Sequence, residues 1–309
     1  MTETAQARRG VLAALASAVL FGTTGTAASF VPASAGPVAI GAARVVIGGF
    51  GLLLALPFLG GRRAQAIRLW RTRLGLAAGL ATALYQLAFF AGVSLVGVAL
   101  GTLVTIGSAP IIVGLLSWVA LGERPTIGWW TSTAICLTGL ALLTFDGSGQ
   151  EGVVIGGLVF ALVSAVAYAA YTVASKQIMR GGVGSTEAMA SAFGLGAVVL
   201  VPVLIFSGAA WLATPEGLVV ALWLGLITTA IAYVLFGRGL RELPAGPVTT
   251  LVLAEPLVAT LLGVGLLGET LGTLGVVGLM LVASGLALQG VISATDGGRD
   301  RPPWGVEPR

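Results

Sequence analysis

The sequence predicts an all-α polytopic membrane protein in which ten transmembrane helices form two inverted five-helix repeats. Apolar side chains make up 57% of the 309 residues and charged ones only 9%, with a mean hydropathy of +1.02. Charged residues are about a quarter of an ordinary soluble domain. Ten apolar stretches are long enough to span a bilayer, and short motifs recur at an offset of 146 to 148 residues. Ten spans leave no room for a soluble domain.

Five spans of about 20 apolar residues, bounded by glycine, proline or charge, are predicted in the first half. They are Gly10–Val31, Pro37–Leu59, Leu74–Leu95, Gly97–Leu121 and Thr126–Phe145. The third and fourth are separated because one helix across both would be about 70 Å long, more than twice the hydrocarbon thickness. We therefore expect a tight turn near Gly97.

Five further spans are predicted in the second half by the same pattern. They are Gly152–Lys176, Ser185–Ser207, Pro215–Leu240, Pro244–Leu267 and Leu271–Gly290. The repeats thus cover residues 10–145 and 152–290, and residues 1–9 and 293–309 are expected to be cytoplasmic tails. Arg8-Arg9, an apolar stretch and Ala33-Ser34-Ala35 imitate a secretory signal peptide. We expect the segment to be retained, because it is longer than a signal core and its loss would upset the charge bias of the loops.

The basic residues predict the orientation, since Lys and Arg gather on the cytoplasmic side. With both termini inside, cytoplasmic segments hold fifteen of the 16 basic residues: Arg8, Arg9, Arg62, Arg63, Arg68, Arg71, Arg73, Arg124, Lys176, Arg180, Arg238, Arg241, Arg299, Arg301 and Arg309. The charged residues of the outer loops are all acidic: Asp146, Glu151, Glu216 and Glu269. We therefore expect a multi-pass protein of the cell inner membrane, with the bilayer as its environment, and read the net charge of +4 as orientation rather than as a nucleic-acid surface.

An internal duplication is the clearest organisational signal. Ser108-Ala109-Pro110 matches Ala254-Glu255-Pro256, Gly122-Glu123 matches Gly268-Glu269, and Gly139-Leu140-Ala141-Leu142 matches Gly285-Leu286-Ala287-Leu288. Because each repeat holds an odd number of spans, the second enters the membrane from the opposite side. Inverted repeats of this kind build many secondary transporters, with a substrate site near mid-membrane.

The composition excludes most chemistry that a membrane enzyme would need. The chain has no histidine and one cysteine, Cys136, which excludes an intramolecular disulfide, a His-based triad and haem, iron–sulfur or zinc sites. We therefore expect no catalytic residues, metal or cofactor, and no enzyme. One chain of ten helices can enclose a path, so we expect a monomer.

Each half closes with Pro, about a dozen apolar residues and Gly-Glu before its last helix (Pro110 to Gly122-Glu123, Pro256 to Gly268-Glu269). In this the chain resembles the EamA branch of the drug/metabolite transporter superfamily, and in general character its YddG-like bacterial amino-acid exporters. The resemblance covers nearly the whole chain and implies a substrate in a central cavity between the halves. Related branches carry nucleotide sugars, phosphorylated sugars or cationic drugs, so these cargoes remain alternatives.

Two groups of residues are predicted to line that cavity. Ser164, Tyr168, Tyr171 and Ser175 fall on one face of the sixth helix, and the equivalent face of the first carries Ser17, Phe21, Thr24 and Ala28. Mid-span aromatic and amide groups form the second set: Tyr85, Gln86, Phe89, Phe90, Tyr233 and Phe236. Such walls suit amino acids or flat metabolites. The alternatives are hydroxyls bonded to their own helix, an interfacial tyrosine belt and packing between helices.

Helix breakers and hydroxyls suggest where the chain bends. Pro110 follows Thr102, Thr105 and Ser108, and Pro256 follows Thr249, Thr250 and Glu255; proline frees a carbonyl one turn earlier, so both are candidate gating hinges or permanent bends. Gly22 and Gly25, beside Thr23, Thr24 and Thr26, are candidates for local unwinding that exposes backbone to a ligand.

Two charges lie within spans, where polarity is costly and functional by default. Glu255 is expected to face the interior and to bind a substrate ammonium or a proton, or to pair with Arg44. Arg44 lies near enough to the periplasmic side to snorkel outward. Glu123 and Glu269 are expected to be structural, at the amino terminus of the following helix.

Together these features predict alternating-access export of small metabolites, with neutral or aromatic amino acids as the first expectation. Proton antiport, exchange and uniport remain open. Predicted substrate contacts are Thr23, Thr24, Tyr85, Gln86, Phe89, Thr105, Ser164, Tyr168, Tyr171, Tyr233 and Glu255. The alternatives of another class are a membrane enzyme or lipid-handling protein, and a non-transporting sensor or assembly subunit, which the short tails disfavour.

Overall fold

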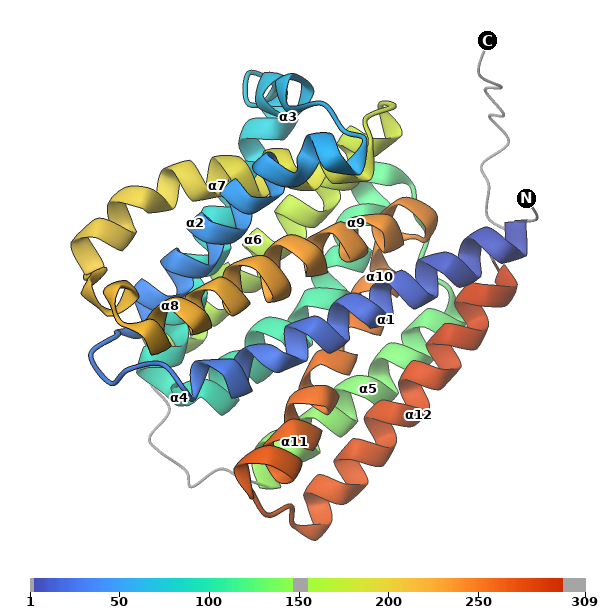
Figure 1. Ribbon diagram of the computed structural model, residues 1–309. Coiled ribbons are helices and arrows are strands. Elements are labelled where there is room, and N and C mark those ends of the chain that lie inside the picture. Colours follow the sequence, from blue (N-terminus) through green and yellow to red (C-terminus); the bar gives the residue numbers. More distant parts are fainter. Residues whose placement is uncertain (1–2, 147–154, 297–309) are drawn as a thin grey trace.

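The computed structural model describes residues 3–146 and 155–296, and every regular element in these ranges is helical (Figure 1). The first half contains α1 (Glu3–Ala28), α2 (Pro37–Ala55), η1 (Leu56–Leu59), α3 (Arg63–Leu69), α4 (Arg73–Leu121) and α5 (Ile127–Asp146). The second contains α6 (Ile155–Arg180), α7 (Ser185–Ser207), η2 (Ala210–Ala213), α8 (Pro215–Leu222), η3 (Trp223–Ile231), α9 (Ala232–Glu242), α10 (Ala245–Val252), α11 (Ala254–Leu267) and α12 (Thr273–Asp296). Within the described residues ten segments are long and apolar enough to cross a membrane. They confirm the ten predicted spans.

Span ends differ from prediction mainly where helices run on beyond the apolar stretch. α1 begins at Glu3, α6 continues past Lys176 to Arg180, and α12 continues to Asp296. The expected tails are therefore partly helical, because a polar helix end reaches beyond the hydrocarbon core without cost. The predicted outer-loop residue Glu151 and the tail from residue 297 lie outside the described residues.

A turn at Gly97 divides α4 into the third and fourth spans, Arg73–Gly97 and Ala99–Leu121. Gly97 has φ 80° and ψ 162°, inside an otherwise helical segment. This backbone region is essentially restricted to glycine, because a Cβ would clash. The predicted turn is therefore confirmed, and its position follows from the one residue type that permits it.

The two proline-containing spans differ from each other. α4 remains helical through Pro110, whereas the ninth span breaks between α10 and α11 at Leu253, with φ −62° and ψ −3°. The two spans therefore differ at equivalent places, and gating hinges at Pro110 and Pro256 remain a prediction. Pro256 lies in the first turn of a new helix, where a missing N–H leaves no intrahelical bond unmade.

Packing between the helices repeats between the halves. The sixth span, α6, packs against α4, as the first span, α1, packs against η3, α9, α10 and α11. α2 pairs with its counterpart α7, and α5 with its counterpart α12. This exchange is what two halves related by a two-fold axis require, and it is consistent with the inverted repeat.

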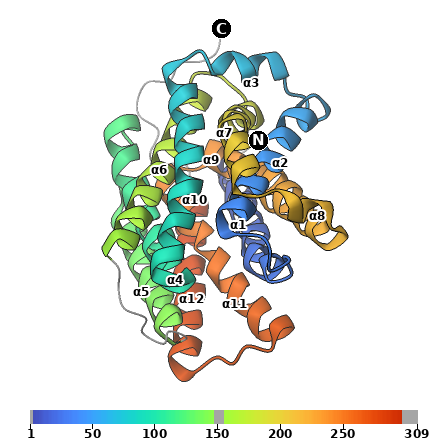
Figure 2. The same ribbon diagram turned by 90° about the vertical axis from the view of Figure 1, so that its left-hand side faces the viewer.

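The bundle has two chemically different ends. α1 begins, and α12 ends, at the end where α3 lies (Figure 1), and the connections after α4, α6 and α9 are there too. We call this the basic end, after the arginines that surround it. Figure 2 shows α5 and α8 on opposite sides of the bundle, with α1 between them.

Candidate functional site

A cavity lies between the two halves, near the middle of several spans. Residues of α1, α2 and α4 line it from the first half, and residues of α6, α9, α10 and α11 from the second. They are Phe21, Arg44, Tyr85, Thr105, Ile106, Ala109, Tyr168, Tyr233, Thr249, Val252 and Glu255. The cavity therefore joins aromatic rings, hydroxyls and two opposite charges in one space.

Aromatic rings from both halves form much of the cavity wall. The ring centroids of Tyr85 and Tyr168 are 5.5 Å apart, and those of Phe21 and Tyr233 are 4.9 Å apart. Tilted and edge-on arrangements at these distances are the favoured ones for aromatic pairs. Rings from the two halves therefore contact one another within the wall.

Five of the eleven residues predicted to contact substrate line this cavity: Tyr85, Thr105, Tyr168, Tyr233 and Glu255. Phe21, on the predicted stripe of the first helix, joins them. Each of the two predicted stripes therefore contributes one residue to the cavity, Phe21 from the first helix and Tyr168 from the sixth.

Two predicted residues stand behind the wall. Tyr171 is fully buried, and its hydroxyl lies 3.2 Å from that of Tyr233. The hydroxyl of Ser164 donates to the carbonyl of Tyr85 over 3.0 Å. Both side chains position cavity tyrosines and do not line the cavity themselves.

Four others face different surroundings. Gln86 is buried against α2, where a Cβ on Gly41 would lie 2.6 Å from its Nε2 atom. Phe89 makes an edge-to-face contact with Phe90, with their ring centroids 5.3 Å apart. Thr23 donates to the carbonyl of Leu20 and accepts from Nε1 of Trp223. The hydroxyl of Thr24 is buried, with no hydrogen-bond partner among the described residues.

α1 remains helical through Gly22 and Gly25, so the expected local unwinding is wrong for this structure. A Cβ on Gly22 would lie 2.8 Å from the carbonyl oxygen of Glu255. Gly22 therefore lets α1 approach α11 closely, which is the common use of glycine between membrane helices. Thr23 also bonds back to its own helix, as the structural alternative predicted.

Arg44 and Glu255 enter the cavity from different halves. Arg44 turns inward rather than snorkelling, and its Nε donates to Oγ1 of Thr229 over 3.0 Å. Its Nη2 donates to the carbonyl of Thr228 over 3.4 Å. In the described part of the chain no ion pair joins Arg44 to Glu255, so the suggested structural pair is wrong. Arg44 and Thr249 line the cavity, although neither was among the predicted substrate contacts.

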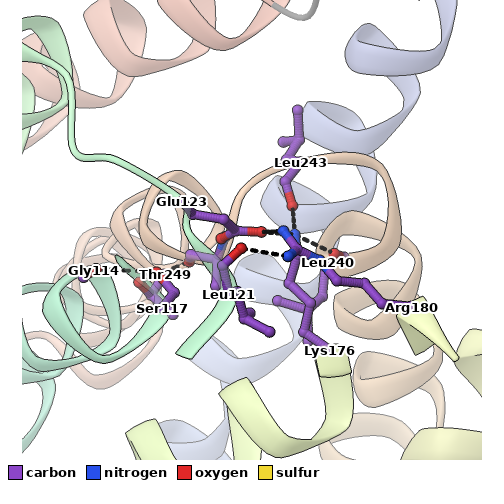
Figure 3. A network of polar contacts seen from close by, with 10 residues as sticks. Gly114, Ser117, Leu121, Glu123, Lys176, Arg180, Leu240, Leu243 and Thr249 are labelled. Carbon is purple, nitrogen blue, oxygen red and sulfur yellow. Dashed lines mark hydrogen bonds and ion pairs between the residues drawn. The ribbon is translucent and has the colours of Figure 1, made fainter. Parts of the chain in front are cut away.

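The basic end is closed by a polar cluster and by packed apolar residues (Figure 3). Nζ of Lys176 lies 3.0 Å from Oε1 of Glu123 and donates to the carbonyls of Leu240 and Leu243. The other carboxylate oxygen of Glu123 accepts from the N–H of Ala245 over 2.7 Å. Glu123 thus caps α10 of the other half, instead of the following α5, and links α4, α6 and α10. We call Glu123, Lys176 and Arg180, which also pairs with Glu123, the basic-end cluster.

Comparisons with known proteins agree with this architecture. The model of the EamA-like transporter family matches residues 8–145 and again 155–290. The uncharacterized transporter YwfM of Bacillus subtilis (strain 168) is 40% identical over 280 residues, which cover 91% of this chain and 92% of that protein. A probable terminal-alkyne amino-acid exporter of Streptantibioticus cattleyicolor is 28% identical over 80% of this chain and 84% of its own. A crystal structure at 22% identity has the same fold, with a TM-score of 0.78 over 92% of this chain and 97% of its own.

Proposed function

This chain belongs to the EamA-like transporter family, and we propose that it exports neutral or aromatic amino acids by alternating access through the central cavity. The observation that carries the proposal is the cavity itself, in which Glu255 lies among the rings of Phe21, Tyr85, Tyr168 and Tyr233. A carboxylate and ring faces both attract an ammonium group. The rings also suit an apolar side chain. The exporter of S. cattleyicolor is a relative whose name agrees with this cargo.

The carboxylate of Glu255 is open to such a ligand. No side chain of the described residues donates a hydrogen bond to it, and Glu255 as a whole residue is half-buried. In lipid an unpaired acid is costly and marks a functional site by default. We therefore assign Glu255 the role of holding the substrate ammonium.

Alternating access requires that one end of the path be closed while the other opens. Between the cavity and the basic end, Phe236, Leu240 and Leu243 are at most 3% exposed, and the basic-end cluster joins both halves beyond them. We propose that the basic end faces the cytoplasm, that this conformation is closed on that side, and that transport breaks the cluster. Both halves of a single chain line the cavity, which supports transport by a monomer.

Glu255→Gln is expected to lower kcat/KM for L-phenylalanine by about 10- to 100-fold in proteoliposomes. The change removes a charged hydrogen-bond acceptor worth about 1.5–3 kcal/mol, and about 1.4 kcal/mol is a factor of ten. Glu269→Gln is the matched control, because Glu269 is exposed at the end of the bundle opposite the basic end, away from the cavity. It should leave the flux within about twofold of the wild type, on the scale of a surface substitution.

The wild-type flux itself decides the cargo. Saturable release of phenylalanine or another neutral amino acid down its gradient supports the proposal. If the protein releases organic cations, nucleotides or sugar derivatives but no amino acid, the proposed cargo is wrong, and transport through the cavity still stands. If none of these amino acids, cations, nucleotides or sugar derivatives is released, transport by the isolated protein is contradicted.

A further inference from the structure

Among the described residues, Arg44 is the one basic side chain that lines the cavity. It lies on α2, whereas Glu255 lies on α11. The two residues belong to different halves and share one space without an ion pair in the described part of the chain. A positive and a negative group that face the same cavity without a direct ion pair form two binding poles.

The guanidinium of Arg44 is held in place while most of its donors stay available. Nε and Nη2 each donate one hydrogen bond, to Thr229 and Thr228, and a guanidinium carries five N–H groups. Both partners lie in η3, a π-helical stretch of the eighth span. Single π-helical turns recur at functional sites. The fixed, planar fork matches the two oxygens of a carboxylate.

We propose that Arg44 binds the carboxylate of the substrate, so that the cavity selects zwitterions. Arg44 and Glu255 then hold the two charged groups of an α-amino acid, and the aromatic wall receives its side chain. This inference rests on the proposed export of amino acids and names the feature that such a cargo must carry. An amine without a carboxylate leaves the charge of Arg44 unmatched. An acid without an amine leaves the carboxylate of Glu255 without an ammonium partner. Sites built around a polar group reject analogues that lack it.

A purely structural role for Arg44 is the competing explanation, because its two hydrogen bonds tie α2 to η3. The two roles differ in what they do to the choice between substrates. A structural defect lowers the transport of every substrate in proportion. Loss of a carboxylate contact lowers the transport of carboxylates alone.

The test compares L-phenylalanine with phenethylamine, which lacks the carboxylate, and with 3-phenylpropionate, which lacks the ammonium. In proteoliposomes with matched protein content, the wild type should prefer phenylalanine to both. Arg44→Gln should lower kcat/KM for phenylalanine at least tenfold and leave phenethylamine within about twofold. Arg44→Lys, which keeps the charge but not the planar fork, should shift the ratio in the same direction by less. Glu255→Gln should lower phenylalanine and phenethylamine together and spare 3-phenylpropionate.

Thr229→Val is the matched structural control, because it removes the acceptor of the Arg44 Nε bond and keeps the charge in the cavity. It should preserve the ratio of phenylalanine to phenethylamine transport. Equal losses of both substrates in Arg44→Gln and in Arg44→Lys would overturn the role of Arg44 while phenylalanine flux through the wild type continues. Absence of that flux would overturn the proposed function and the zwitterion site with it.

Discussion

Glu123→Ala is expected to lower the free energy of unfolding by about 3–5 kcal/mol, because it leaves a buried cation without its counter-charge. The side chains of Lys176 and Glu123 are only 7% and 10% exposed, so water cannot replace the lost carboxylate. The substitution also frees the N–H of Ala245 at the start of α10. The thermal unfolding of the detergent-solubilised protein measures this loss. A cysteine introduced by Val248→Cys, in a Cys136→Ser background, reports on the same loss. Val248 is fully buried in the closed form, so Glu123→Ala should increase the labelling of this cysteine by a thiol reagent.

Two further variants show whether the buried pair is responsible. Arg180→Gln removes the other cation of the cluster, but its side chain is 45% exposed, and such pairs contribute about 0–1 kcal/mol. Combining Glu123→Ala with Lys176→Met removes both buried charges, which is often neutral or stabilising. The double variant should therefore recover most of the stability that the single variant loses. Unfolding of Glu123→Ala at the wild-type temperature would contradict this account of the cluster.

Apolar length and the repeat were sufficient to predict the ten helical spans. In a bilayer the backbone must satisfy its own hydrogen bonds, so an apolar stretch of about 20 residues permits little besides a helix. The length limit that separates the third span from the fourth also required the turn near Gly97. These constraints act along the chain, and a sequence therefore displays them.

The contents of the cavity depended on contacts across the chain, which periodicity does not specify. Tyr168 and Tyr171 lie on the same predicted stripe, yet Tyr168 lines the cavity and Tyr171 is covered by Phe193 and Tyr233. Arg44 is close enough to a membrane surface to snorkel, and only the carbonyl and hydroxyl of the π-helical segment explain its inward direction. A helical pattern predicts which face of a helix is polar, but the neighbour that covers this face comes from the fold.

The coupling of Glu123 to Lys176 escaped prediction for a similar reason. Both residues were placed at the cytoplasmic side, Lys176 as one more topological charge. α6 runs one turn further than predicted, to Arg180, so Lys176 lies within the packed end of a span. A basic residue preceding the last helical turn, together with the Gly-Glu motif of the other half, is the signal that would have suggested the pair.

Gly97→Ala is expected to destabilise the protein by about 1–3 kcal/mol, the cost of holding an L residue in a region restricted to glycine. Gly107→Ala, on the same element, provides the matched control. Gly107 is helical, and a Cβ there would meet its nearest neighbours at 3.6–3.7 Å, which is ordinary contact. That change should be neutral or stabilising by up to about 1 kcal/mol, because alanine is the better helix former. Unfolding temperatures measured in one detergent should therefore move in opposite directions, or fall for Gly97→Ala alone. Equal unfolding temperatures for the two variants would contradict this account. They would mean that the turn does not require the positive φ of Gly97, and that alanine at this position also allows the third span to end there.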